Sequence, residues 1–492
     1  MLQPLLAQSI DERISSAMDP VSSAIESVVF YSIPVAGVNL PLIVLWLVAA
    51  GAFFTVYLGF LNLRGPKHAL DLVRGQYSNP DDAGEVTHFQ ALATAVSGTV
   101  GLGNIAGVAV AIAIGGPGAT VWMIIAGFLG MSSKMAECTL GVKFRRERPD
   151  GTVSGGPMYY LEQGIAEVTG RVRTGRTLAV LFSISCIGGA IGAGNMFQAN
   201  QATAQIIAVT GGEDSPIADF RWVVGLIFAI TVGAVIIGGI KSIARVTEKL
   251  VPIMAAIYLS AALLVIGSNL AEVPAAFGEI FRQAFALDSA YGGIIGALIV
   301  GFQRAAFSNE AGIGSAAIAH SAVRTEHPST EGHVALLEPF IDTVIICTMT
   351  ALIIVISGAY LDPVAGELGG VALTSAAFAT VLPWFPNVLA VAVVAFAFST
   401  MLTWSYYGMK STGYLFDDSE VAETVFKVIF CIFVVVGASL SLGPVIGISD
   451  SMLFLMAIPN VLGLYILAPL VKKEIYAYRD KVESGEIAKV DH

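Results

Sequence analysis

Long apolar runs alternate with short polar connections along almost the whole chain. Each run has about 20 residues, the length that an α-helix needs to cross the hydrocarbon core of a bilayer. The pattern predicts eleven membrane-spanning helices, near residues 40–61, 89–115, 118–143, 177–209, 221–240, 250–268, 290–320, 334–358, 386–411, 423–442 and 450–471. We therefore expect an all-α integral membrane protein.

A glycine-rich segment interrupts the second run. Residues Ser97–Ala106 read S-G-T-V-G-L-G-N-I-A, and a related segment, S-N-E-A-G-I-G-S-A-A, occupies Ser308–Ala317 in the seventh run. The two copies share identical residues at an offset of 211 positions: Ser97/Ser308, Gly101/Gly312, Gly103/Gly314 and Ala106/Ala317. Glycine weakens a helix, so both runs should break there. Close packing of small residues between helices is the alternative interpretation.

The breaks divide the chain into two related halves. After the first run is set aside, each break lies in the first helix of a set of five. Five is an odd number, so the second set enters the membrane from the opposite side, and the halves are inverted repeats with a binding site at mid-depth. We expect an amphipathic segment at 1–30, an extra transmembrane helix at 31–62, five-helix repeats at 89–268 and 290–471, and a cytoplasmic tail at 472–492.

Lysine and arginine gather in alternate connections. They are frequent at 62–88, 143–176 and 241–249 and rare at 209–221, 268–290 and 358–386. By the positive-inside rule the N-terminus is external and the C-terminus is cytoplasmic. We expect the protein in a bacterial inner membrane.

The composition supports a membrane protein and excludes a nucleic-acid-binding one. Hydrophobic residues make up 55% of the chain and charged residues 13%, and the mean hydropathy is +0.76. The net charge of −11 offers no basic face to phosphates. The four cysteines lie in apolar runs, so we expect them to be small buried side chains without a disulfide or metal role.

Several longer motifs carry a resemblance to known families. V-G-L-G-N at Val100–Asn104 resembles the unwound first core helix of the neurotransmitter:sodium symporters, which have the leucine-transporter fold. A broader resemblance, over nearly the whole chain, is to the alanine or glycine:cation symporter family. It rests on G-G-P-G-A-T-V-W-M-I-I-A-G-F-L-G-M-S-S-K-M-A-E from Gly115, S-G-G-P-M-Y-Y-L from Ser154, G-A-G-N-M-F-Q-A-N from Gly192, A-F-S-N-E-A-G-I-G-S from Ala306 and F-S-T-M-L-T-W-S-Y-Y-G from Phe398.

The resemblance implies import of small neutral amino acids, chiefly alanine and glycine, with sodium as the coupling ion. It implies one sodium site made by the carbonyls of Ser97 and Val100 with the hydroxyls of Ser399 and Thr400. A second candidate cation site consists of the Asn104 side chain and the Thr99 carbonyl. The alternative for Ser399 and Thr400 is a hydrogen bond back to their own helix.

A zwitterionic substrate needs donors for its carboxylate and acceptors for its ammonium, and the ends of broken helices supply both. We assign the carboxylate to the backbone of Gly101–Gly103 and the region of Thr99, and the ammonium to carbonyls near Phe307, Ser308 and Asn309. A second set of residues adds polar contacts and cavity walls: Gln198 with Asn195, and Phe307 with Trp404. A small cavity gives only a graded preference between alanine and glycine.

Charged residues within the runs need partners or functions. We expect Lys134 to pair with Glu137, and Arg304 and Glu310 to form a gate or a structural ion pair. Glu338 and Asp342 share a helix face without an assigned role. His320 ends a span, and a further set of histidines is expected in solvent: His68, His88, His327, His333 and His492.

The sequence therefore favours a secondary transporter working by alternating access. Proton coupling through Glu310 is the alternative within the same class. The sequence contains no ring-forming filter motif of the kind that a channel needs. It also has no Ser/His pair or carboxylate dyad at matching depth, which argues against a hydrolase.

Overall fold

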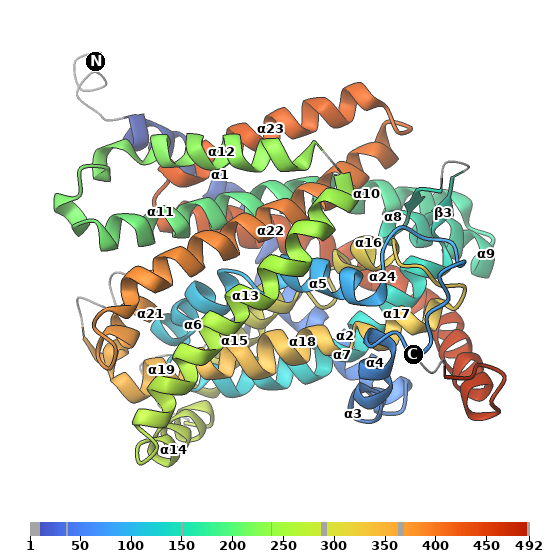
Figure 1. The fold of residues 1–492 in the computed structure, drawn as a ribbon, viewed down its shortest axis with the longest axis horizontal. Coiled ribbons are helices and arrows are strands. Elements are labelled where there is room, and N and C mark those ends of the chain that lie inside the picture. The colour runs from blue at the N-terminus through green and yellow to red at the C-terminus, as the bar shows by residue number, and fades with distance from the viewer. Residues whose placement is uncertain are drawn as a thin grey trace.

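The protein is a bundle of helices with two very small sheets (Figure 1). The computed structural model describes residues 10–35, 38–148, 151–237, 239–286, 293–362 and 369–489. The predicted all-α architecture is confirmed in its main part. The short hairpin-like pairs were not predicted: β1 (Ser32–Val35) pairs antiparallel with β2 (Val38–Pro41), and β3 (Arg146–Glu147) with β4 (Val153–Ser154).

The α-helices differ widely in length. In chain order they are α1 (Ile10–Val29), α2 (Leu42–Tyr57), α3 (Leu61–Arg64), α4 (Pro66–Val73), α5 (His88–Thr99), α6 (Val108–Gly115), α7 (Ala119–Lys143), α8 (Pro157–Tyr159), α9 (Ile165–Thr169), α10 (Val172–Ile191), α11 (Phe197–Val209), α12 (Arg221–Ile236), α13 (Gly239–Ser268), α14 (Val273–Ala284), α15 (Gly293–Asn309), α16 (Ala316–His320), α17 (Pro328–Val334), α18 (Leu337–Pro339), α19 (Thr348–Ser357), α21 (Gly370–Ala379), α22 (Phe385–Leu415), α23 (Glu420–Ser439) and α24 (Leu442–Glu483).

Shorter helical segments of other pitch join several of these helices. Four in the described part of the chain are π-helical, namely η2 (Gly103–Gly107), η3 (Tyr160–Gly164), η4 (Gly192–Met196) and η7 (Phe340–Cys347). Three are 3₁₀-helical, namely η5 (Gly212–Asp214), η6 (Ala218–Phe220) and η8 (Ala359–Leu361). Because π-helical turns are rare and often occur at functional sites, η2, η4 and η7 mark a region of interest.

Among the described residues, eight helical stretches are long and apolar enough to cross a membrane, and nine if a bent pair counts as one span. They are Ala119–Lys143, Val172–Val209, Ala218–Ile236, Gly239–Ser268, Pro328–Ser357, Phe385–Leu415, Glu420–Ser439 and Leu442–Glu483, and the bent pair His88–Thr99 with Gly103–Gly115. The predicted run at 40–61 corresponds to the shorter α2. The run at 290–320 is split between α15 and α16, and its first three residues lie outside the described part.

Two connections each contain a helix of ten or more residues that the sequence did not predict. The connection at 268–290 holds α14, and the connection at 358–386 holds α21. Both helices have only 10 to 12 residues, too few to register as a spanning run. Helix α21 packs against η2, which places it beside the first break.

Local sequence explains where the first broken helix begins. Thr87 and Gln90 form a reciprocal capping box, in which Gln90 N donates to Thr87 Oγ1 (3.2 Å) and Thr87 N to Gln90 Oε1 (3.1 Å). The helix that follows, α5, packs against α13, α16 and α22 and is largely buried, and it lies near the middle of the view in Figure 1. The break is therefore held inside the protein.

The segment predicted to be amphipathic contains α1, while residues 1–9 lie outside the described part. Helix α1 packs along α24, where Ser22 Oγ donates to the Pro444 carbonyl (3.3 Å). Its place at a membrane surface stays a prediction.

Candidate transport site

The first break follows the predicted residues. Helix α5 ends at Thr99, and the chain resumes as η2 and α6 with a bend of 48°. Asn104 Oδ1 accepts a hydrogen bond from Gly101 N (3.0 Å), so an amide side chain replaces a lost backbone acceptor. A methyl group on Gly101 would lie 2.5 Å from Thr400 Oγ1, which explains why this position has no side chain.

The second break begins directly after Asn309. Three residues have positive φ angles, Glu310 (57°), Gly312 (84°) and Gly314 (92°), and α16 starts at Ala316. Two of these are glycines, which adopt this conformation without strain. Side-chain amides again satisfy the freed backbone, because Asn309 Oδ1 accepts from Ala311 N (3.0 Å) and Asn460 Nδ2 donates to the Gly312 carbonyl (2.9 Å). Both predicted breaks are thus present.

The two breaks touch each other. Asn104 Nδ2 donates to Ser308 Oγ (3.1 Å), and a methyl group on Gly103 would lie 3.3 Å from the Ser308 Cα atom. Asp342 completes the contact, since Ser308 Oγ donates to its Oδ2 atom (2.6 Å) and Asn104 Nδ2 donates to its carboxylate. Thr343 Oγ1 donates to the same Oδ2 atom (2.7 Å). This buried polar cluster, formed by Asn104, Ser308, Asp342 and Thr343, joins η2, α15 and η7.

Asp342 is the residue of this cluster to which sequence reasoning gave no role. Its side chain is fully buried, and it forms no ion pair with a cationic side chain in the described part of the chain. Its position inside an apolar run was the available signal, because carboxylates at membrane depth are rarely without function. Its proximity to Asn104 could not be read from positions 238 residues apart.

The predicted sodium ligands from the first break and α22 partly meet. Thr400 Oγ1 donates to the Ser97 carbonyl (2.9 Å), which links the two elements. Val100 is buried at the end of α5. Ser399 Oγ instead donates to the Phe396 carbonyl (3.0 Å), so its hydroxyl bonds back to its own helix. The Thr99 hydroxyl likewise faces the carbonyls of its own helix.

Gln198 lies against the first break as expected. Its Oε1 atom accepts from Leu102 N (3.3 Å), and its Nε2 atom donates to the Ala193 carbonyl (3.0 Å) in η4. Asn195 does not join it, because its Nδ2 atom donates to the Phe430 carbonyl on α23 (2.6 Å). The Asn309 amide is also held elsewhere, by Thr343 Oγ1 (2.8 Å).

The two predicted aromatic walls lie beside the second break. The Phe307 ring contacts Phe197 edge-on at 4.9 Å between centroids. Trp404 Nε1 donates to Glu310 Oε1 (3.1 Å), so the indole is tied to the break itself. A methyl group on Gly194 would overlap the Trp404 ring, which means that the ring is pressed against the backbone of η4. Phe307 and Trp404 therefore have fixed places.

Comparison with known proteins identifies the family to which this chain belongs. A family model described as "Sodium:alanine symporter family" matches residues 25–492. The chain belongs to this family. Its members are transporters, and the family resemblance expected from the motifs is confirmed.

Relatives in this family have several named substrates. The symporter is 38% identical over 441 residues to "Sodium/alanine symporter AgcS" of Methanococcus maripaludis, covering 89% of this chain and 94% of the relative. It is 33% identical over 448 residues to Bacillus subtilis GlnT, named as a probable sodium/glutamine symporter, covering 90% of this chain and 89% of that one. Bacillus subtilis YrbD, whose name describes a sodium/proton-dependent alanine carrier, is also 33% identical over 448 residues, with 88% of each chain covered.

A solved structure supports the fold. The symporter matches the crystal structure of MhsT in complex with L-phenylalanine with a TM-score of 0.53, over 80% of this chain and 99% of that chain, at 16% identity. MhsT has the leucine-transporter fold, so the expected fold type is confirmed.

Arg304 and Glu310 do not pair with each other, so the predicted ion pair between them is wrong, while their role as a gate stays a prediction. Arg304 forms an ion pair with Asp450 Oδ2 on α24, and Gln303 Nε2 donates to the same oxygen (3.2 Å). Glu310 accepts hydrogen bonds from Ser315 and Trp404. Residues three or four apart face each other on a helix, whereas a spacing of six places side chains on different faces. Asp450 is a functional candidate that sequence reasoning missed.

Lys134 and Glu137 also have other partners than expected. Lys134 Nζ lies 3.0 Å from Glu338 Oε1, and Asn460 Nδ2 donates to Glu137 Oε1 (2.8 Å). Both charges of the Lys134–Glu338 pair are fully buried. This pair ties α7 to α18 and gives Glu338 a structural partner.

His88 and His333 were expected in solvent, but both are buried. His88 Nδ1 lies 2.5 Å from Glu331 Oε1, and His320 Nδ1 contacts the other oxygen of the same carboxylate. His333 is buried as well, with Nδ1 2.8 Å from the Ser329 carbonyl. His320 ends α16, as predicted. His492 lies outside the described residues.

The Lys134–Glu338 pair generates a stability prediction. Removing one partner of a buried ion pair leaves the other charge uncompensated, which costs about 3–5 kcal/mol. We expect Lys134→Gln to lower the free energy of unfolding in detergent by that amount. The double variant Lys134→Met with Glu338→Leu should recover most of the loss, and equal stability of the single variant and the native protein would contradict this role.

Proposed function

We propose that this chain is a sodium-coupled symporter of small neutral amino acids, with alanine and glycine as substrates. The observation that carries the proposal is the contact between the two broken helices through Asn104, Ser308 and Asp342. A buried polar cluster between two helix breaks is where a transporter of this architecture binds its cargo. AgcS, named as a sodium/alanine symporter, supports the choice of substrate and ion.

The proposal includes eleven spans, with one extra helix followed by two inverted repeats of five. The related breaks, one at the first helix of each repeat, support this arrangement. We infer an external N-terminus and a cytoplasmic C-terminus in a bacterial inner membrane from the distribution of Lys and Arg. Alternating access then consists of one half rocking against the other around the site.

The substrate carboxylate is assigned to the N–H groups of the first break. In the structure, side-chain oxygens of Asn104 and Gln198 hold the N–H groups of Gly101 and Leu102. A carboxylate can replace these oxygens without leaving the donors bare. The ammonium is assigned to carbonyls of the second break near Phe307 and Ser308, and Trp404 limits the size of the side chain.

Two cation sites are assigned beside the substrate. The first uses the carbonyls of Ser97 and Val100 with Thr400 and Ser399. The second uses Asn104, the Thr99 carbonyl, Ser308 and Asp342, where the carboxylate adds the negative charge that a cation requires. Oxygen ligands of this kind suit a hard monovalent cation.

Proton coupling through Glu310 is the second candidate function. Glu310 is buried, and both of its hydrogen-bond donors among the described residues, Ser315 and Trp404, are neutral. A carboxyl group in such a place is least costly when it carries a proton, which makes it a candidate proton carrier. The name of YrbD, which mentions both ions, favours keeping this alternative.

Uptake by proteoliposomes tests the proposed function. We expect radiolabelled alanine to accumulate only when an inward sodium gradient is imposed, because the ion and the amino acid bind together. Potassium in place of sodium is the control. Equal uptake in both ions would reject sodium coupling.

A pair of variants separates the two coupling ions. Asp342→Asn removes the charge from the proposed cation site and should raise the sodium concentration for half-maximal uptake by about tenfold, since hydrogen bonds to charged groups contribute about 1.5–3 kcal/mol. Glu310→Gln should leave the pH dependence of uptake unchanged. A pH dependence that disappears in Glu310→Gln, with native sodium dependence in Asp342→Asn, would instead support proton coupling.

The glycines of the first break provide a matched steric test. Gly101→Ala places a methyl group against Thr400 Oγ1 and should reduce sodium-dependent uptake by tenfold or more, since overpacking costs about 1–3 kcal/mol. Gly107→Ala is the control, because no atom lies within 4 Å of a methyl group there. Similar uptake by both variants would argue against the site.

A further inference from the structure

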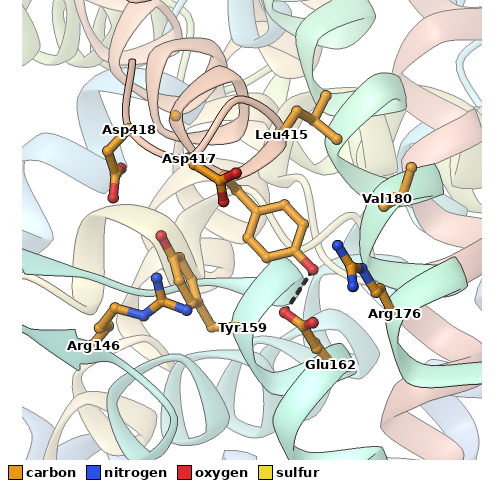
Figure 2. A pocket seen from close by; sticks show the side chains of 10 residues that line it. Arg146, Tyr159, Glu162, Arg176, Val180, Leu415, Asp417 and Asp418 are labelled. Atoms are coloured by element: carbon orange, nitrogen blue, oxygen red, sulfur yellow. Dashed lines mark hydrogen bonds between the residues drawn. The ribbon is translucent and has the colours of Figure 1, made fainter. Parts of the chain in front are cut away.

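A polar cavity of about 210 Å³ lies apart from the two breaks, between β3, η3, the start of α10 and the turn that joins α22 to α23 (Figure 2). Its lining includes Arg146, Tyr159, Glu162, Arg176, Tyr414 and Asp417. Pockets that enclose drug-sized ligands have roughly 300–1,000 Å³, so this one suits a ligand of few atoms.

Apart from Asp418, which pairs with Arg148, the lining has equal numbers of acidic and basic side chains. Asp418 is neutralised by Arg148, with Nη2 2.6 Å from Oδ1. Two carboxylates, Glu162 and Asp417, and two guanidinium groups, Arg146 and Arg176, remain. Figure 2 shows Arg146 and Arg176 on opposite sides of the view, with Glu162 and Asp417 between them. A phosphate or another multiple anion would meet the carboxylates, whereas a ligand carrying one charge of each sign is matched.

Part of the lining is already fixed and part is free to bind. Tyr414 Oη donates to Glu162 Oε2 (2.8 Å), and the Arg146 guanidinium lies 5.4 Å from the centre of the Tyr159 ring. Arg176 and Asp417, by contrast, form no ion pair or hydrogen bond with any residue in the described ranges. They offer one donor fork and one carboxylate to an incoming molecule.

We propose that this cavity is a second binding site for a small zwitterionic amino acid, with Arg176 holding its carboxylate and Asp417 its ammonium. The proposal rests on the proposed function, because the transported substrate is itself such a zwitterion. By the inferred orientation the site faces the cytoplasm, where imported substrate accumulates. No sodium ligand set is needed, since the side chains supply both charges.

The cavity is connected to the transport site through named contacts. Tyr160 follows the lining residue Tyr159, and its hydroxyl bonds to Asn460, which in turn donates to the Gly312 carbonyl in the second break (2.9 Å). Tyr414 belongs to α22, the helix that also carries Thr400 and Trp404. A ligand that bridges α10 and the α22–α23 turn therefore braces elements that hold the second break.

Binding of radiolabelled alanine to the purified full-length protein tests the site. We expect two alanines per chain in sodium and one in potassium, the one in potassium being at the cavity. Arg176→Gln and Asp417→Asn should each weaken binding in potassium at least tenfold and leave the sodium-dependent alanine in place. Asparagine suits position 417, where φ is 49°. Alanine in potassium should also raise the unfolding temperature of the native protein but not of these variants.

Arg173→Gln is the matched control, an exposed arginine one turn before Arg176 that does not line the cavity. Binding of a single alanine that requires sodium, unchanged in Arg176→Gln, would overturn the second site and leave the proposed function intact. Binding in potassium that persists in Arg176→Gln would overturn it too. Absence of any alanine binding in sodium would instead remove the proposed function.

Discussion

Backbone polar groups that lose their helical partners must find others inside the protein, because a bilayer offers none. The structure meets this constraint at both breaks with amide side chains. Asn104 and Gln198 hold N–H groups of the first break, and Asn309 and Asn460 hold an N–H and a carbonyl of the second. Amides are neutral and carry both a donor and an acceptor. In the proposed transport site they can satisfy the backbone before a charged ligand binds, and give way to it without leaving an unpaired charge.

Local sequence signals were sufficient where the structure depends on local chemistry. The glycines of Ser97–Ala106 and Ser308–Ala317 predicted both breaks, and the apolar runs predicted the long helices. Thr400 was predicted as a cation ligand through a family resemblance, and Gln198 and Trp404 as a polar contact and a wall of the substrate site. Each of the three contacts a residue of a break. The short helices α14 and α21 escaped because a reading based on spans of about 20 residues does not detect elements of half that length.

Partner choice among the buried charges could not be predicted, because it depends on contacts between distant segments. Lys134 has Glu137 one turn away, yet it pairs with Glu338, which is 204 positions further along the chain. Arg304 forms its ion pair with Asp450 and not with Glu310, which is six residues away, and His88 and His320 both contact the Glu331 carboxylate. In a low-dielectric interior the partner that gives better geometry wins over the one that is near in sequence. Spacing along one helix is a weak guide where several helices contribute charges to one region.

The contact between Gly194 and Trp404 restricts how the size of an accepted substrate could change in the proposed site. The indole cannot retreat, because the backbone of η4 already touches its ring, and its N–H is anchored to Glu310. In the proposed transport site, a family member that accepts bulkier solutes would therefore need a smaller side chain in place of Trp404 or Phe307. Without the indole ring, the close contact that excludes a side chain at Gly194 would also be absent.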